Sequence, residues 1–137
     1  MSPSRPASIG VDVDSSPGVI VAKLEPTDRR LVAGLDSGPE ARATLLGDDI
    51  LRAADSSRNP LVLDMLGVDW IDSGACAVLI KVSQSLRVRG QPLVISLTNP
   101  VHETFRITGL VRLIPCFTDL ASAVAAAQSA RPSGPAT

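Results

Sequence analysis

The chain has 137 residues, enough for one domain with its own core. Thirteen Lys and Arg residues nearly balance 14 Asp and Glu residues, and the aromatic residues are one Trp and two Phe. These totals argue against nucleic-acid binding, which favours a basic face and stacking aromatic rings. No apolar run has the length of a membrane helix, and the first ten residues lack the apolar centre of a signal peptide. We therefore expect a cytoplasmic protein that does not bind membranes.

The first quarter of the chain predicts a β-hairpin. Residues 1–8 are polar and Pro-rich and predict a flexible tail. Apolar and polar residues alternate over 9–14, and a second apolar run covers 19–24. Ser16-Pro17-Gly18 between the two runs is typical of a turn. The segment 25–37 has no clear pattern, although Leu31-Val32-Ala33 fits either a short strand or a turn.

The middle of the chain predicts helix, strand and helix in turn. Gly38-Pro39 begins a helix of about 16 residues, because Pro favours the first helical position. The apolar run Leu61–Met65 suits a buried strand and carries one acidic residue, Asp64. After a polar bend and Trp70-Ile71, apolar residues recur at helical spacing from Ser73 to about Arg89. Ser73 stands where an N-cap belongs, a place that tolerates negative charge.

The last third alternates strand and helix again. Residues 93–97 form an apolar strand, and Asn99-Pro100 reads as the N-cap and first position of a short helix that ends at Gly109. Residues 113–117 predict an edge strand, because Pro115 interrupts them. Thr118 is the expected cap of an Ala-rich helix over 119–129, and 130–137 predict a flexible tail.

This alternation predicts the fold class. Strands that alternate with helices favour βαβ units with parallel strands, and the hairpin adds an antiparallel strand. We expect a single α/β domain over residues 9–129, with a mixed sheet. The two cysteines, Cys76 and Cys116, lie in apolar surroundings, which favours buried reduced thiols. A redox pair is the alternative, and it requires Cα atoms within roughly 7 Å of each other.

At this point the sequence resembles a known family. The runs LVLDMLGVDWIDSGACAVLI (61–80) and RGQPLVISLTNPVHETFRITGLVRLIPCFTDLASAVAA (89–126) resemble the STAS domain, and in particular the small bacterial anti-sigma factor antagonists. The resemblance covers about half of the chain. It implies a mixed β-sheet with helices packed largely on one side.

The resemblance also implies a partner-switching function without enzymatic activity of its own. Such an antagonist binds an anti-sigma factor, a serine kinase with a GHKL-type ATP site, and a sigma factor is released. The kinase then phosphorylates the antagonist, and a serine phosphatase resets the system. By position, Ser73 is the phosphorylation site here. The expected partner-binding residues are Asp64, Asp69, Trp70, Asp72, Ser73, Gly74 and Ala75.

Two other functions stay open on the sequence. The family's loop usually continues after the acceptor serine with Ser or Thr and Gly, whereas this chain continues Gly74-Ala75-Cys76-Ala77. A STAS interaction module without a phosphoserine cycle is therefore the second hypothesis. A serine hydrolase is the third, but the Gly-x-Ser-x-Gly elbow is absent and nothing positions the single histidine, His102. Neither a cofactor motif nor paired metal ligands are present, so we expect no cofactor and no metal.

Overall fold

The computed structural model describes residues 10–16, 18–25, 29–31, 39–55 and 58–130. Both predicted tails, apart from Ala130, lie outside these ranges. Within them, one mixed sheet has the strand order β1-β2-β4-β6-β7. β1 (Gly10–Ser16) and β2 (Val19–Glu25) form the predicted antiparallel hairpin. β4 (Leu61–Met65), β6 (Leu93–Leu97) and β7 (Cys116–Phe117) run parallel to β2, as the alternation of elements predicts.

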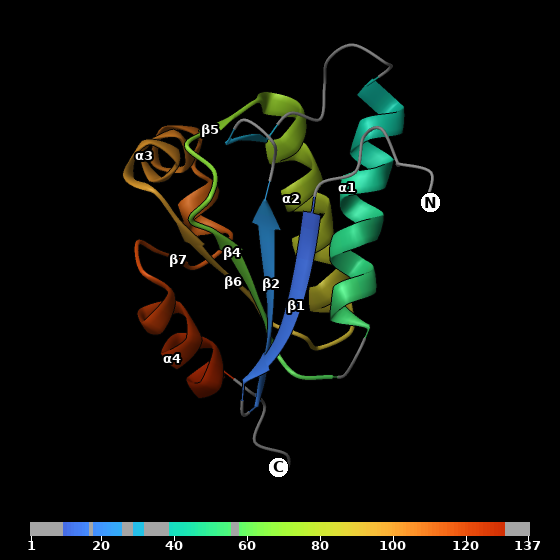
Figure 1. The fold of residues 1–137 in the computed structure, drawn as a ribbon, viewed down its shortest axis with the longest axis vertical. Coiled ribbons are helices and arrows are strands. Elements are labelled where there is room, and N and C mark those ends of the chain that lie inside the picture. The colour runs from blue at the N-terminus through green and yellow to red at the C-terminus, as the bar shows by residue number, and fades with distance from the viewer. Residues whose placement is uncertain (1–9, 17, 26–28, 32–38, 56–57, 131–137) are drawn as a thin grey trace.

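Helices cover both faces of this sheet (Figure 1). α1 (Pro39–Ala54) and α2 (Ser73–Val88) lie on one face, and α4 (Leu120–Ala130) lies on the other. α3 (Asn99–Thr108) and the short 3-10 helix η1 (Leu110–Arg112) follow β6. Side chains of α1, α2 and α3 share one apolar core, which confirms that the helices pack largely on one side. None of the described helices has the length and apolar character needed to cross a membrane.

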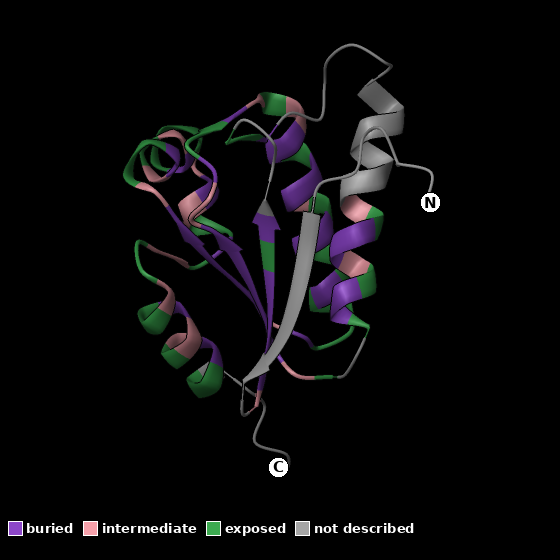
Figure 2. Ribbon diagram, viewed as in Figure 1, coloured by how far each residue is buried: buried purple, intermediate pink, exposed green. Residues whose placement is uncertain are grey.

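The two central strands are apolar because both of their faces are covered. Leu61, Leu63 and Met65 of β4 point into the larger core under α1 and α2. Val62, between them, points to the opposite face and packs with α4. All five residues of β4, and all five of β6, are buried (Figure 2). Strands buried on both faces carry nearly continuous apolar runs, which explains why short apolar runs in the sequence identified them.

Several predicted boundaries are wrong by a few residues. Thr98 occupies the N-cap position of α3 without a capping hydrogen bond from its side chain, so Asn99 is already helical and Pro100 follows it. β7 contains only Cys116 and Phe117, because η1 and the turn after it occupy the chain just before. β7 is an edge strand, as Pro115 indicates.

The start of α4 also differs from the sequence prediction. Asp119, not Thr118, accepts hydrogen bonds from the backbone N–H and the hydroxyl of Ser122, with the carboxylate oxygen 3.3 Å and 2.9 Å away. A carboxylate at this position satisfies a donor of the first helical turn, as a hydroxyl does. α4 then ends at Ala130, one residue beyond the predicted end.

A second, two-stranded sheet lies at the end of the molecule where β2 and β4 end (Figure 1). β3 (Arg30–Leu31) pairs in parallel with β5 (Trp70–Ile71), with Arg30 opposite Trp70 and Leu31 opposite Ile71. For the segment that had no clear pattern, the structure therefore supports a short strand at Arg30–Leu31. This small sheet places residues 29–31 beside the loop that leads into α2.

Replacing either of two glycines by alanine should change the free energy of unfolding, with opposite signs at the two positions. Gly109 ends α3 with a φ of 83°, and a Cβ added there meets no atom within 4 Å. Gly109→Ala should therefore lower the free energy of unfolding by about 1 kcal/mol through backbone strain alone. Gly47 lies inside α1, where a Cβ would make an ordinary contact of 3.6 Å with Val78. Gly47→Ala should raise the free energy of unfolding by about 1 kcal/mol.

Urea unfolding of both variants at an unchanged m-value measures these shifts. Equal signs for the two variants would contradict the assigned backbone conformations.

Candidate functional site

The candidate site is built on the segment that joins β4 to α2. β4 ends at Met65, and a turn is closed by the Val68 N–H, which donates to the Met65 carbonyl at 3.0 Å. The Thr98 hydroxyl, at the start of α3, donates to the Val68 carbonyl at 2.8 Å. Val68 itself is fully buried. The turn is therefore held from both sides, and the residues that follow it are presented in a fixed orientation.

The buried side chain of Asp64 fixes the position of this turn. Its side chain is buried, with 5% of the residue exposed. The Oδ1 atom accepts hydrogen bonds from the Leu66 N–H at 3.0 Å and from the Ser96 hydroxyl at 3.3 Å. A buried carboxylate costs free energy unless it is hydrogen-bonded, and these two donors offset that cost. Asp64, expected among the partner-binding residues, thus supports the surface from underneath.

Asp72 is the N-cap of α2. Its backbone is extended, with φ −95° and ψ 172°, and its Oδ1 atom accepts a hydrogen bond from the Ala75 N–H at 2.8 Å. The Asp72 N–H donates to the Leu31 carbonyl at 3.1 Å, which ties the cap to β3. The prediction that Ser73 is the N-cap is therefore wrong by one residue. The Asp72 carboxylate also places a negative charge at the helix N-terminus, where the helix dipole favours it.

Ser73 is the first residue of α2, and its side chain is exposed. Within the described ranges, no hydrogen bond engages its hydroxyl, and none joins it to His102. Gly74 is half-buried, whereas Ala75 and Cys76 turn inward and are buried. The hydroxyl therefore faces solvent at the positive end of a helix of 16 residues.

Two arginines that the sequence analysis missed complete the surface. Arg29 forms an ion pair with Asp69, with its Nε atom 3.0 Å from Oδ2, and both side chains are about half exposed. The Arg30 guanidinium lies 4.4 Å from the centre of the Trp70 ring, a cation–π contact. Trp70 is 42% exposed. Two adjacent arginines directly after the sequence Pro-Thr-Asp were the available signal, but the sequence does not show that this segment pairs with Trp70.

Exposed and half-buried residues from two distant segments thus form one surface, which we call the switch surface and define as Arg29, Arg30, Asp69, Trp70, Asp72, Ser73 and Gly74. It brings together every expected site residue except Asp64 and Ala75, which are buried. Searched over the described residues, the structure contains no group of three or more His, Cys, Asp or Glu side chains placed to hold a metal ion.

Comparison with known proteins identifies the group of proteins that this chain resembles. A family model described as the STAS domain matches residues 40–123. The candidate anti-sigma factor antagonist BtrV of Bordetella bronchiseptica is 30% identical over 93 residues, which cover 67% of this chain and 80% of that protein.

Solved structures share the fold. An anti-sigma factor antagonist from Mycobacterium paratuberculosis superposes with a TM-score of 0.69 at 24% identity, covering 91% of this chain and 98% of that one. A serine-to-glutamate variant of RsbS from Moorella thermoacetica gives a TM-score of 0.65 at 20% identity, covering 87% and 95% of the respective chains.

The cap of α2 can be tested by substitution. Asp72→Ala should lower the free energy of unfolding by about 1 kcal/mol, because the Ala75 N–H loses its acceptor. Asp72→Ser should recover most of that loss, since a hydroxyl can accept the same bond. Chemical unfolding of the three proteins gives the comparison, and an Asp72→Ala variant as stable as the wild type would contradict the cap.

The environments of the two cysteines predict slow thiol chemistry. Both cysteines are free. Burial raises the pKa of the Cys116 thiol to about 12. Burial, together with the negative charge of Asp72, raises the pKa of the Cys76 thiol. Both groups therefore stay neutral well above pH 7, and the neutral thiol is a poor nucleophile.

At pH 8 both thiols of the folded protein should react with a disulfide reagent much more slowly than in the unfolded chain. Absorbance of the released thiolate measures both rates. Rapid formation of a Cys76–Cys116 disulfide under mild oxidation would instead support the redox pair.

Proposed function

Because the chain belongs to the STAS domain family, we propose that it is an anti-sigma factor antagonist controlled by phosphorylation of Ser73. The partner is an anti-sigma factor that is also a serine kinase of the GHKL type, and a serine phosphatase removes the phosphate. The observation that carries the proposal is the exposed Ser73 hydroxyl at the first position of α2, within the switch surface.

A phosphate fits this position without unfolding the protein. It would lie beside the N–H groups of the first helical turn, where the helix dipole favours negative charge. Asp72 already uses one of these donors, the Ala75 N–H. Modification should therefore leave the fold intact and change mainly the surface.

The change in surface charge explains how binding would be lost. Phosphorylation adds nearly two negative charges beside Asp72 and close to Asp69 in sequence. The Asp69 charge is partly offset by its ion pair with Arg29, and Asp72 is the acidic residue next to the phosphate in the chain. An acidic partner surface would be repelled, and an apolar one would bind less well because the phosphate would lose its hydration. A loss of about 3 kcal/mol of interface free energy weakens binding roughly a hundredfold.

The unusual sequence after Ser73, which the structure places in the first turns of α2, is compatible with this switch. Ala75 and Cys76 differ from the family's usual residues, but both are buried beneath the surface. Gly74 is half-buried and Ala77 is exposed. Two of the four differing residues therefore alter packing beneath the first turns of α2 rather than the face that a kinase would contact. The alternative is an interaction module that is not phosphorylated. Partner binding that does not change when ATP is added would favour this alternative.

Mass spectrometry tests the modification directly. Protein isolated from its native host under several growth conditions should carry a phosphatase-sensitive phosphate on Ser73. Incubation with the host's anti-sigma kinase and ATP should produce the same site in vitro. Ser85, exposed near the other end of α2, provides the matched control, because Ser85→Ala should be phosphorylated normally whereas Ser73→Ala should not. Phosphate on another residue, or on none, would contradict the proposal.

Trp70 should be an energetic anchor of the interface. Tryptophan is enriched among the few interface residues whose truncation costs about 2 kcal/mol or more, so Trp70→Ala should weaken kinase binding at least about tenfold. Val88 is 88% exposed at the far end of α2, and Val88→Ala is the control that should bind normally. Titration calorimetry measures both affinities. Because Trp70 is the single tryptophan, its fluorescence also reports docking directly in the wild type. Equal affinities of the two variants for the kinase would contradict a role for Trp70 in the interface.

A further inference from the structure

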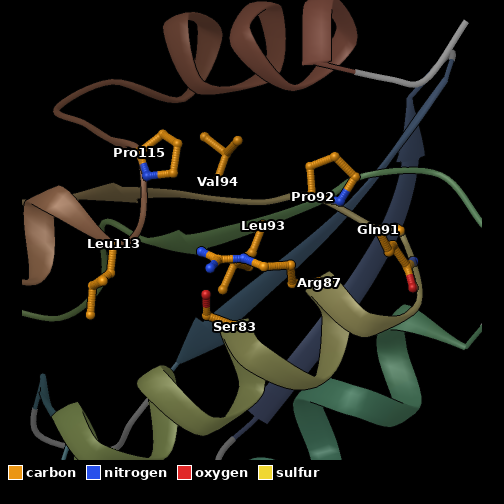
Figure 3. A pocket seen from close by; sticks show the side chains of 9 residues that line it. Ser83, Arg87, Gln91, Pro92, Leu93, Val94, Leu113 and Pro115 are labelled. Atoms are coloured by element: carbon orange, nitrogen blue, oxygen red, sulfur yellow. The ribbon is translucent and has the colours of Figure 1, made fainter.

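A pocket of about 370 Å³ opens near the other end of α2, beside the first residues of β6 (Figure 3). This volume falls within the range of small-ligand sites, about 300–1,000 Å³. α2 contributes Ser83 and Arg87, β6 contributes Leu93, and the chain before β7 contributes Leu113 and Pro115. The pocket is separate from the switch surface, because Ser83 and Ser73 are almost three helical turns apart on α2.

The pocket contains an open stretch of sheet edge. The Leu61 N–H donates to the Pro92 carbonyl at 2.9 Å, so the backbone of Pro92 faces β4. Alternation along the strand turns the N–H and carbonyl of Leu93 to the opposite edge. Two residues further on, the Ile95 N–H donates to the Pro115 carbonyl at 3.0 Å, where β7 begins. Pro115 has no N–H, so the ladder cannot extend back to the Leu93 carbonyl. Across the described ranges, no backbone group pairs with the outward edge of Leu93.

Ser83 adds a buried hydroxyl. Only 9% of the residue is exposed, and its hydroxyl has no hydrogen-bond partner in the part of the chain that the structure describes. Figure 3 shows this hydroxyl turned toward Arg87 and Leu93, into the pocket. An unpaired buried hydroxyl is unfavourable, and most such groups in proteins are satisfied. A ligand oxygen in the pocket would satisfy it.

Arg87 adds a positive charge. Its neighbour Arg89 forms an ion pair with Asp55, and Arg52 forms one with Asp49. Arg87 has no carboxylate partner among the described residues, and Figure 3 shows its guanidinium reaching across Leu93 into the pocket. A guanidinium binds a carboxylate through two parallel hydrogen bonds, which makes it a specific receptor for that group.

We propose that this pocket binds an N-acylated apolar amino acid, a group that also forms the end of a peptide with an apolar C-terminal residue. The carboxylate pairs with Arg87 and accepts a hydrogen bond from Ser83. The ligand's amide pairs with the open edge of Leu93, as an added strand would. Its apolar side chain packs against Leu113, which is 48% exposed, and against Pro115.

Three ligands separate these contacts. N-acetyl-leucine carries the carboxylate, the amide and the side chain. N-acetyl-leucinamide lacks the carboxylate, and 4-methylpentanoate lacks the amide. NMR titration of the full chain should show N-acetyl-leucine binding, with shifts at Leu93 and Ser83 and affinities for the other two at least about tenfold lower.

Three variants test the residues. Arg87→Gln should weaken N-acetyl-leucine binding at least about tenfold, and Ser83→Ala about threefold to tenfold. Ser83→Ala should also keep or raise the urea midpoint, because it removes an unpaired hydroxyl. Arg106 is exposed on α3 and paired with Glu103, so Arg106→Gln is the matched control and should bind as the wild type does.

A peptide, acetyl-Ala-Ala-Leu, distinguishes the two sources of this chemistry. Affinity at least about tenfold higher than for N-acetyl-leucine indicates a peptide C-terminus, and equal affinity indicates a free acylated amino acid. The proposal is overturned if N-acetyl-leucine causes no shift at about 10 mM. It is also overturned if N-acetyl-leucinamide binds as tightly as N-acetyl-leucine, or if the Arg87→Gln variant binds N-acetyl-leucine as tightly as the Arg106→Gln control does.

Discussion

Burial of β4 on both faces is the constraint on which the rest of the structure depends. Its odd-numbered residues pack under α1 and α2, whereas Val62 packs against α4. A strand with no solvent-facing side requires a strand on each edge and a helical layer on each face. β2, β6 and the helices supply these, and the amino end of α2 is brought to the edge where β4 ends. The location of the switch surface follows from that packing.

Two aspartates with different surroundings give the switch surface its geometry. Asp64 is buried, and it holds the turn after β4 through the Leu66 N–H and the Ser96 hydroxyl. Asp72 is half-buried and caps α2 through the Ala75 N–H. One carboxylate stabilises the approach to the helix and the other stabilises its start. Trp70 lies between the two aspartates in the chain and Ser73 directly follows the second, and both side chains are exposed.

The two ends of α2 differ in chemistry. Its first turn offers N–H groups and an exposed hydroxyl to an added phosphate. Its last turns carry Arg87, without a carboxylate partner in the described ranges, next to an edge of β6 that Pro115 prevents β7 from covering. One helix can therefore present a modification site at one end and a ligand pocket at the other. Binding at one end does not need to displace residues at the other.

The sequence by itself determined the succession of strands and helices, the parallel arrangement of most strands, and the position of Ser73 at the start of a helix. These follow from local rules, because apolar periodicity, Pro at helix starts and Gly at helix ends act over a few residues. The resemblance to the STAS domain rested on the same local runs around Asp64 and Ser73.

Tertiary structure decided the rest. Whether Asp72 or Ser73 caps α2 depends on the backbone angles at the junction, which the hydrogen bond to Leu31 helps to set. The contact of Arg30 with Trp70 joins segments 40 residues apart, and no local pattern encodes it. The open edge of Leu93 likewise depends on the register between β6 and β7. Each of these features arises from pairing between distant segments, and a single sequence does not specify such pairing.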